Sequence, residues 1–183
     1  MVLLKSTPIP LGTPAPNFSL PSVDGRRYTL EDFPSAQALL VMFICNHCPY
    51  VVAVEDRIIQ LQREYGPKGV QLVGICSNDP TDYPDDSPAK LLERWRSKAY
   101  GFPYLIDETQ ETAKAYEAVC TPDLYLFDGE RRLYYHGRID DHWQDAGKVT
   151  RRELASAVDR LLKGEAALEE QWPSMGCSIK WKK

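Results

Sequence analysis

Two short apolar runs constrain the fold of this 183-residue chain most strongly. Residues 38–44 and residues 70–77 are predominantly apolar and too short to span a membrane. Strands without polar alternation are typically buried on both faces, as in a parallel sheet covered by helices. Between the two runs, residues 49–65 repeat apolar positions at helical spacing and stop at Gly66–Pro67. We therefore expect two parallel strands joined by a crossover helix.

Shorter elements continue this alternation of strands and helices. A turn signal at Asp24–Gly25 predicts an N-terminal hairpin, and Thr150 is expected to cap a final helix. The alternation predicts an α/β fold with three layers, α/β/α, around a mixed central sheet. The remaining expected elements are strands at 18–20, 27–30, 103–107, 123–127 and 133–137 and helices at 88–99, 109–116 and 150–163, with a Pro-rich extended lead at 1–17 and an irregular polar stretch at 138–149.

The composition limits which compartment and which binding partners we expect for this chain. A net charge of −4 argues against a general nucleic-acid binder, which needs a basic face to neutralise phosphates. The sequence begins without a signal-peptide pattern and has no long apolar run, so we expect a cytoplasmic protein that does not bind a membrane. In a reducing compartment, the five cysteines are more often catalytic, metal-binding or core residues than structural disulfides.

The chemistry of the sequence centres on Cys45, His47 and Cys48, where the first apolar run gives way to the helix. Only a thiolate attacks a disulfide, and the free N–H groups of a helix N-terminus stabilise that negative charge. A protonated His47 would lower the thiol pKa further. A pair of buried core thiols is one alternative. A metal site completed by Cys120, Cys177 or His47 is another, but one Cys-x-x-Cys lacks the second ligand pair of a structural zinc site. We expect neither a metal nor a bound cofactor.

These residues and two further stretches resemble the thioredoxin-like superfamily. A strand, Cys-x-x-Cys and helix are followed at a distance by Thr121–Pro122, and the superfamily opens the strand facing its active cysteine with a cis-proline. Residues 12–20 are similar to the redoxin branch shared by peroxiredoxins and thiol-disulfide oxidoreductases. The Cys-Asn-His-Cys-Pro-Tyr run and the final Gly-Cys-Ser-Ile-Lys-Trp run resemble an uncharacterised bacterial subgroup of thioredoxin family proteins.

This resemblance implies a thioredoxin fold in one domain over residues 1–183. The resemblance covers a core at 12–163, followed by a tail at 164–183 that carries Cys177. It implies a cis bond before Pro122 and a substrate groove in which Thr121 presents its backbone to a bound disulfide. The implied partners are a protein or small-molecule disulfide and a thiol reductant. A homodimer stays open.

Two registers compete for the attacking cysteine. In one, Cys45 attacks and Cys48 resolves, with His47 just before the second cysteine. In the other, the nucleophile lies five residues after a strand Phe, as is usual in thioredoxins, and Phe43 has that spacing to Cys48. Pro49 suits the first helical position, where a missing N–H costs nothing. This favours Cys48 as the attacking thiol at the helix N-cap, with Cys45 as the first choice to resolve.

Two of the other three cysteines, Cys120 and Cys177, each have two interpretations. Cys120 is either a third redox thiol or a small core residue. Cys177 either resolves an intermediate, within or between subunits, or packs in the tail under Trp172 and Trp181. Cys76 lies in a predicted buried strand and is expected to be core.

Two other functions remain possible. A peroxiredoxin-like peroxidase would place Thr or Ser three residues before the peroxidatic cysteine and Pro seven before it, but Cys45 and Val41 stand there relative to Cys48. Arg138 is expected to be solvated or salt-bridged rather than bound to the thiolate. The second alternative is a thiol sensor or metal-binding module without turnover.

The remaining polar residues suggest no further site. We expect the acidic stretch to be a solvated loop, since it lacks the Gly and Glu spacing of a calcium-binding loop. We interpret the other two histidines as structural or surface residues. The acidic residues are Asp79, Asp82, Asp85 and Asp86, and the histidines are His136 and His142.

Overall fold

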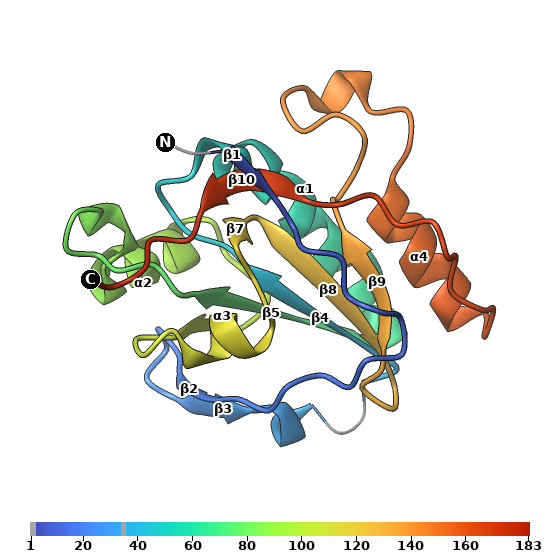
Figure 1. Ribbon diagram of the computed structural model, residues 1–183, viewed down its shortest axis with the longest axis horizontal. Helices are drawn as coiled ribbons and strands as arrows, with labels where there is room; N and C mark the ends of the chain where they lie inside the picture. The colour runs from blue at the N-terminus through green and yellow to red at the C-terminus, as the bar shows by residue number, and fades with distance from the viewer. Residues whose placement is uncertain (1–2, 34–35) are drawn as a thin grey trace.

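The computed structural model describes residues 3–33 and 36–183. At its centre lies a sheet in the order β6-β5-β4-β8-β9 (Figure 1). The first three of these strands are parallel, and the last two form an antiparallel hairpin. This is the mixed sheet that the strand–helix alternation predicts. The strands are β4 (Ala38–Phe43), β5 (Val70–Cys76), β6 (Tyr104–Ile106), β8 (Asp123–Asp128) and β9 (Leu133–Gly137).

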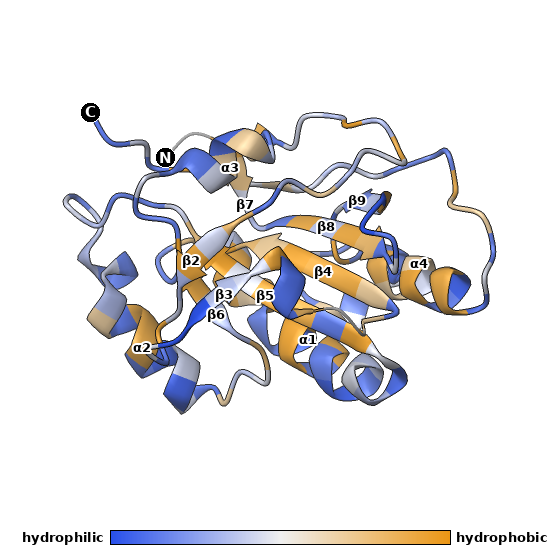
Figure 2. Cartoon of the chain, turned by 90° about the horizontal axis from the view of Figure 1, so that it is seen from below, coloured by the Kyte–Doolittle hydropathy of each residue, from blue (hydrophilic) through white to orange (hydrophobic). Residues whose placement is uncertain are grey.

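Helices cover both faces of the sheet and complete the three layers. Figure 2 shows α1 and α4 on one face and α3 on the other. Alternate residues of β4 follow this division: Leu40 and Met42 pack with α1 and α4, whereas Val41 packs with α3 and the N-terminal hairpin. No helix in the described part of the chain is long and apolar enough to cross a membrane. The helices are α1 (Pro49–Tyr65), α2 (Pro88–Ser97), α3 (Glu111–Ala115) and α4 (Glu153–Leu162).

Local signals set most element boundaries, with one exception. The hairpin of β2 (Ser19–Pro21) and β3 (Arg27–Thr29) is confirmed. Thr150 does not cap the last helix, because its amide donates to Asp141 Oδ1 at 2.9 Å and its hydroxyl donates to the same carboxylate. The helix therefore begins three residues later. Short 3-10 turns lie at Leu30–Asp32, Gly66–Lys68, Pro84–Asp86 and Ala146–Lys148.

A second sheet joins three segments that are far apart in the sequence. Its order is β1-β10-β7, with both pairings antiparallel, and the strands are β1 (Leu3–Lys5), β7 (Cys120–Thr121) and β10 (Met175–Ser178). In Figure 1 the red strand β10 lies beside the dark blue strand β1. The sequence predicted neither β1 nor β10. The region expected to be a tail thus pairs with the segment just before Pro122.

Candidate active site

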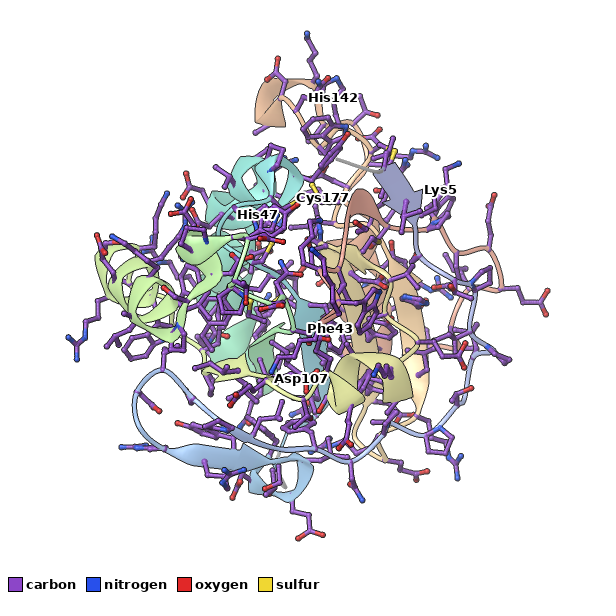
Figure 3. All side chains as sticks on the ribbon, turned by 60° about the vertical axis from the view of Figure 1, so that its left-hand side comes forward. Lys5, Phe43, His47, Asp107, His142 and Cys177 are labelled. Carbon is purple, nitrogen blue, oxygen red and sulfur yellow. The ribbon has the colours of Figure 1, made fainter. Side chains whose placement is uncertain are left out.

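Cys48 stands at the N-cap of α1, in extended backbone conformation, with Pro49 at the first helical position. The predicted helix start is therefore confirmed. The thiol lies at the positive end of the α1 dipole, where negative charge is stabilised. The whole residue is 0% exposed. Figure 3 shows the neighbouring His47 and Cys177 at this end of the molecule.

Three segments converge on the Cys48 sulfur. Cys48 Sγ lies 2.9 Å from Cys177 Sγ of β10 and 3.2 Å from the Thr121 carbonyl oxygen of β7. Cys45, just past the end of β4, has its sulfur 3.4 Å from Thr121 Oγ1. The peptide bond between Thr121 and Pro122 is cis, as expected. The structure thus brings together the Cys-x-x-Cys, the expected groove residues and the tail cysteine.

Hydrogen bonds make Cys48 the acidic member of this cluster. Donation from Cys45, supported by Cys177 and the Val51 amide, outweighs burial and lowers the pKa of Cys48 to about 5. Burial raises the pKa of Cys177 to about 12 and the pKa of Cys45 well above its ordinary value. At neutral pH, Cys48 is therefore a thiolate that accepts hydrogen bonds from two protonated thiols.

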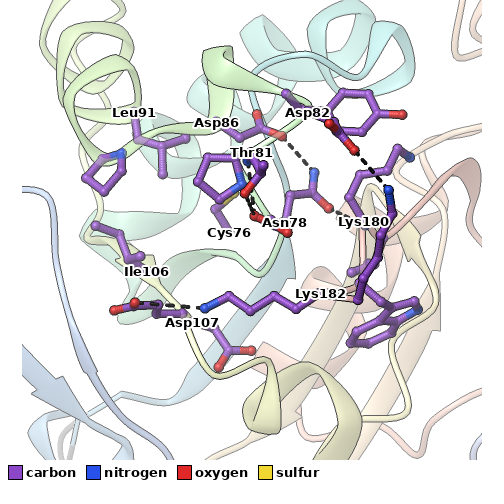
Figure 4. A pocket seen from close by; sticks show the side chains of 18 residues that line it. Cys76, Asn78, Thr81, Asp82, Asp86, Leu91, Ile106, Asp107, Lys180 and Lys182 are labelled. Atoms are coloured by element: carbon purple, nitrogen blue, oxygen red, sulfur yellow. Dashed lines mark hydrogen bonds and ion pairs between the residues drawn. The ribbon is translucent and has the colours of Figure 1, made fainter.

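Asp86 corrects the expectation that the whole acidic stretch is solvated. Its side chain is fully buried and bonds the Cys-x-x-Cys loop. One oxygen accepts from the backbone amides of Asn46 at 2.8 Å and His47 at 3.2 Å. The other accepts from His47 Nδ1 at 2.5 Å and Asn78 Nδ2 at 2.8 Å. Figure 4 shows the Asp86–Asn78 bond at the edge of a pocket of about 950 Å³. The carboxylate satisfies donors that the buried loop would otherwise leave unpaired.

His47 is fixed by the same carboxylate. If Nδ1–H of a neutral ring donates to Asp86, Nε2 is the acceptor nitrogen of that ring. Among the described residues Nε2 has no hydrogen-bond partner, and the ring stacks on Tyr83 at 4.4 Å between centroids. A nitrogen of His47, the Cys45 sulfur and a carboxylate oxygen of Asp86 lie within 4.8 Å of one another, so they are potential metal ligands. The four donors already on Asp86 favour an anchoring role for it instead.

Replacing Asp86 with Asn is expected to destabilise the protein by about 2 kcal/mol at pH 7, because an amide cannot accept from every one of these donors. Burial raises the pKa of Asp86, but the bonds from His47 and Asn78 outweigh it and hold the pKa below 3.8. The stabilisation is present above the unfolded pKa and is lost as the pH falls through the lower folded value. Urea unfolding at several pH values measures the difference. The matched control is Asp85→Asn, since Asp85 is exposed; an equal loss there would contradict the anchoring role.

The remaining candidates are thiols with a raised pKa or members of ion pairs. Cys76 and Cys120 are buried, and burial raises the pKa of each, so both are poor nucleophiles at neutral pH. Arg138 donates to Glu153 at 2.5 Å, in line with the salt-bridged role expected for it. His136 Nε2 lies 2.9 Å from a buried oxygen of Asp123 and is structural.

Fold, site and relatives together define a thiol-disulfide oxidoreductase with a thioredoxin-like fold. The chain belongs to the AhpC/TSA family, whose model matches residues 11–136. Among curated proteins, it is 23% identical over 129 residues to the thiol-disulfide oxidoreductase ResA of Bacillus thuringiensis subsp. konkukian, covering 70% of each chain.

Solved structures extend the likeness to the tail. An uncharacterised conserved protein of Geobacillus kaustophilus is 47% identical, with a TM-score of 0.95, over 100% of this chain and 97% of that one. A putative thiol:disulfide interchange protein DsbE of Chlorobium tepidum is 19% identical, with a TM-score of 0.65, over 85% of this chain and 99% of that one. At that identity it supports the fold alone. The expected thioredoxin fold is confirmed.

Proposed function

We propose that Cys48 attacks the substrate disulfide and that Cys177 completes the exchange. The Cys48 thiolate attacks one substrate sulfur, forms a mixed disulfide and releases the other substrate sulfur as a thiolate. The Cys177 thiol then loses its proton and attacks the Cys48 sulfur. This step forms a Cys48–Cys177 disulfide and releases the second substrate sulfur, which takes up a proton. The 2.9 Å separation of the two sulfurs is the observation that carries this assignment.

The surroundings of the other thiols support this choice of partner. Cys45, the first choice from the sequence, is held at Thr121 Oγ1 and donates to the Cys48 thiolate, so its role here is to lower the pKa of Cys48. Cys177 is 1% exposed, which favours pairing within one chain over pairing between subunits. His47 fixes the loop through Asp86, and Thr121 with Pro122 forms the wall of the substrate groove.

Disulfide mapping tests the assignment. We expect the reduced protein, treated with oxidised glutathione and digested, to yield a peptide pair linked through Cys48 and Cys177. A Cys45–Cys48 bridge would overturn the choice of partner while leaving the dithiol chemistry in place. Absence of any bridge through Cys48 would overturn the proposed mechanism. Cys76→Ser serves as the matched control, because burial raises the pKa of the Cys76 thiol, so its loss should not change the map.

Peroxide reduction is the second candidate function, favoured by the complete burial of Cys48, which a small oxidant reaches more readily than a large one. The same thiolate would give a sulfenic acid with hydrogen peroxide, and Cys177 would condense with it and release water. The pairing of Arg138 with Glu153 disfavours this function, because it holds the guanidinium away from thiolate stabilisation. Comparing the rate of hydrogen peroxide consumption with the rate of disulfide exchange shows which reaction the protein catalyses faster.

We further propose that a cellular thiol reductant returns the oxidised protein to the dithiol state, with the cytoplasm as the place of action. The two electrons needed to reduce the Cys48–Cys177 disulfide come from two thiols of that reductant, which leaves oxidised. All five cysteines being buried fits a reducing compartment, where structural disulfides are rare. Fractionation of cells that produce the protein tests the location.

A further inference from the structure

The nucleophile is enclosed by the last strand of the chain. Residues 174–179, here called the C-terminal strap, contain β10 and place Cys177 against Cys48. The strap also bonds to Ser6, the residue after β1. The Ser6 amide donates to the Ser174 carbonyl oxygen at 3.0 Å, and the Ser6 hydroxyl accepts from the Ser174 amide at 2.9 Å. In disulfide exchange, a sulfur of the substrate must come into contact with the attacking sulfur, here that of Cys48. On this face of Cys48, a sulfur of the protein itself already holds that position.

The strap shows how a cysteine-bearing polypeptide fits the site. β10 runs antiparallel to β7, with Cys177 opposite Thr121. The residue before Cys177 must be glycine, because a Cβ on Gly176 would lie far inside van der Waals contact with the Thr121 carbonyl oxygen. An extended segment therefore fits only with a minimal side chain immediately before its cysteine.

A second requirement comes from Met175. Side chains two apart lie on the same face of a strand, so Met175 shares the face of Cys177. Met175 lines a pocket of about 360 Å³ together with Pro122, Tyr50 and Trp143. The rings of Tyr50 and Trp143 lie 4.1 Å apart between centroids. An apolar side chain two residues before a cysteine would be accommodated there. The strap thus has the sequence pattern that the site accepts: an apolar residue, a glycine and a cysteine.

We propose that the C-terminal strap occupies the substrate's place and that the substrate is an extended polypeptide that replaces it strand for strand. The inference rests on the proposed attack by Cys48. A segment with an apolar residue, glycine and a disulfide-bonded cysteine pairs with β7 when the strap leaves. Its main-chain groups replace the hydrogen bonds that β10 gives up. Cys48 attacks the sulfur that stands where Cys177 stood and expels the sulfur bonded to it. Return of the strap brings Cys177 back to Cys48 and releases the reduced segment.

A pair of peptides tests the substrate class. The probe is an octapeptide with the sequence of residues 173–180, Pro-Ser-Met-Gly-Cys-Ser-Ile-Lys, whose cysteine carries a 5-thio-2-nitrobenzoate group in disulfide linkage. Attack at the peptide sulfur releases the coloured thiolate, which is followed by absorbance. The matched peptide has valine in place of its glycine. We expect the glycine peptide to react with the reduced protein about tenfold faster or more, which corresponds to a modest difference in transition-state binding. Both peptides are also timed against free cysteine to correct for intrinsic reactivity.

Two protein variants test the displacement of the strap. Gly176→Val should force the strap off β7 and raise the rate with the glycine peptide about tenfold. Ser6→Ala removes only a hydroxyl acceptor from the anchoring of the strap and should raise the same rate by a smaller factor. Amide hydrogen exchange of residues 175–178 should quicken in both variants, while α1 stays protected. The hydrogen-exchange measurement distinguishes release of the strap from misfolding. Ser6→Ala keeps the test valid if Gly176→Val does not fold.

The outcomes separate this inference from the proposed function. If both peptides react at the same corrected rate, and neither variant changes that rate despite faster exchange in β10, the strap does not hold the substrate's place. Disulfide exchange itself would then still stand. If the two peptides and oxidised glutathione all react with free cysteine but none reacts with the reduced protein, the proposed attack by Cys48 fails as well.

Discussion

Replacing Cys48 with Ser is expected to reduce disulfide exchange by about 1,000-fold or more, the scale seen when a catalytic nucleophile is removed. A serine hydroxyl is almost entirely protonated at neutral pH, whereas the Cys48 thiol is ionised with a pKa of about 5. The hydroxyl also cannot form a mixed disulfide with the substrate. The side chains differ by one atom, so the N-cap of α1 and the surrounding strands should persist.

The measurement is the initial rate with oxidised glutathione or a peptide disulfide. Cys76→Ser and Cys120→Ser are the controls, since burial raises the pKa of both thiols. Each should keep most of the wild-type rate. A Cys48→Ser protein that folds and still turns over, together with an inactive Cys45→Ser protein, would reassign the nucleophile to the other register of the Cys-x-x-Cys.

Ionisation of Cys48 is expected near pH 5, well below the ordinary thiol pKa of 9.0. At pH 7, a group with this pKa is about 99% thiolate, whereas a free cysteine is only a few per cent ionised. The sign follows from the hydrogen bonds: donation from Cys45 and Cys177 stabilises the charged form, so the proton leaves at lower pH. Exchange rates should therefore fall as the pH drops through 5 and stay level up to neutral pH.

The ultraviolet absorbance of the thiolate measures this ionisation directly, because it does not require a reagent to reach the buried sulfur. The difference between wild-type and Cys48→Ser protein isolates the one group. In Cys177→Ala the loss of one donor should move the midpoint upward, since the thiolate loses a hydrogen bond. A wild-type midpoint near 9 would contradict the low pKa of Cys48.

The central sheet and the position of Cys48 at the start of α1 are predictable from the sequence because their signals are local. Pro49 and Gly66 mark the two ends of α1, and Pro49 at the first helical position places Cys48 at the N-cap. The two apolar runs become β4 and β5, which are buried almost throughout. Each of these predictions depends on side chains within a few residues of one another.

The features that were missed depend on distant contacts. Asp86 looks like its acidic neighbours in sequence, and only the fold brings the amides of residues 46 and 47 to its carboxylate. β10 is four residues long and contains a glycine, which weakens any strand signal. Its partners β1 and β7 lie at the other end of the chain and in its middle. A hint was present: an isolated Gly in a strand can mark a close approach of another backbone, as Gly176 does at Thr121.

The contact between the Cys48 and Cys177 sulfurs also bears on how the protein survives an excess of oxidant. A sulfenic acid on Cys48 is converted irreversibly to a sulfinic acid only if a second oxidant molecule arrives before a thiol does. Damage of that kind depends on oxidant concentration. Capture by Cys177, 2.9 Å away, is a reaction within one molecule and does not. We therefore expect the strand that encloses the nucleophile also to protect it, because a Cys48–Cys177 disulfide is an oxidation state that a thiol can reverse.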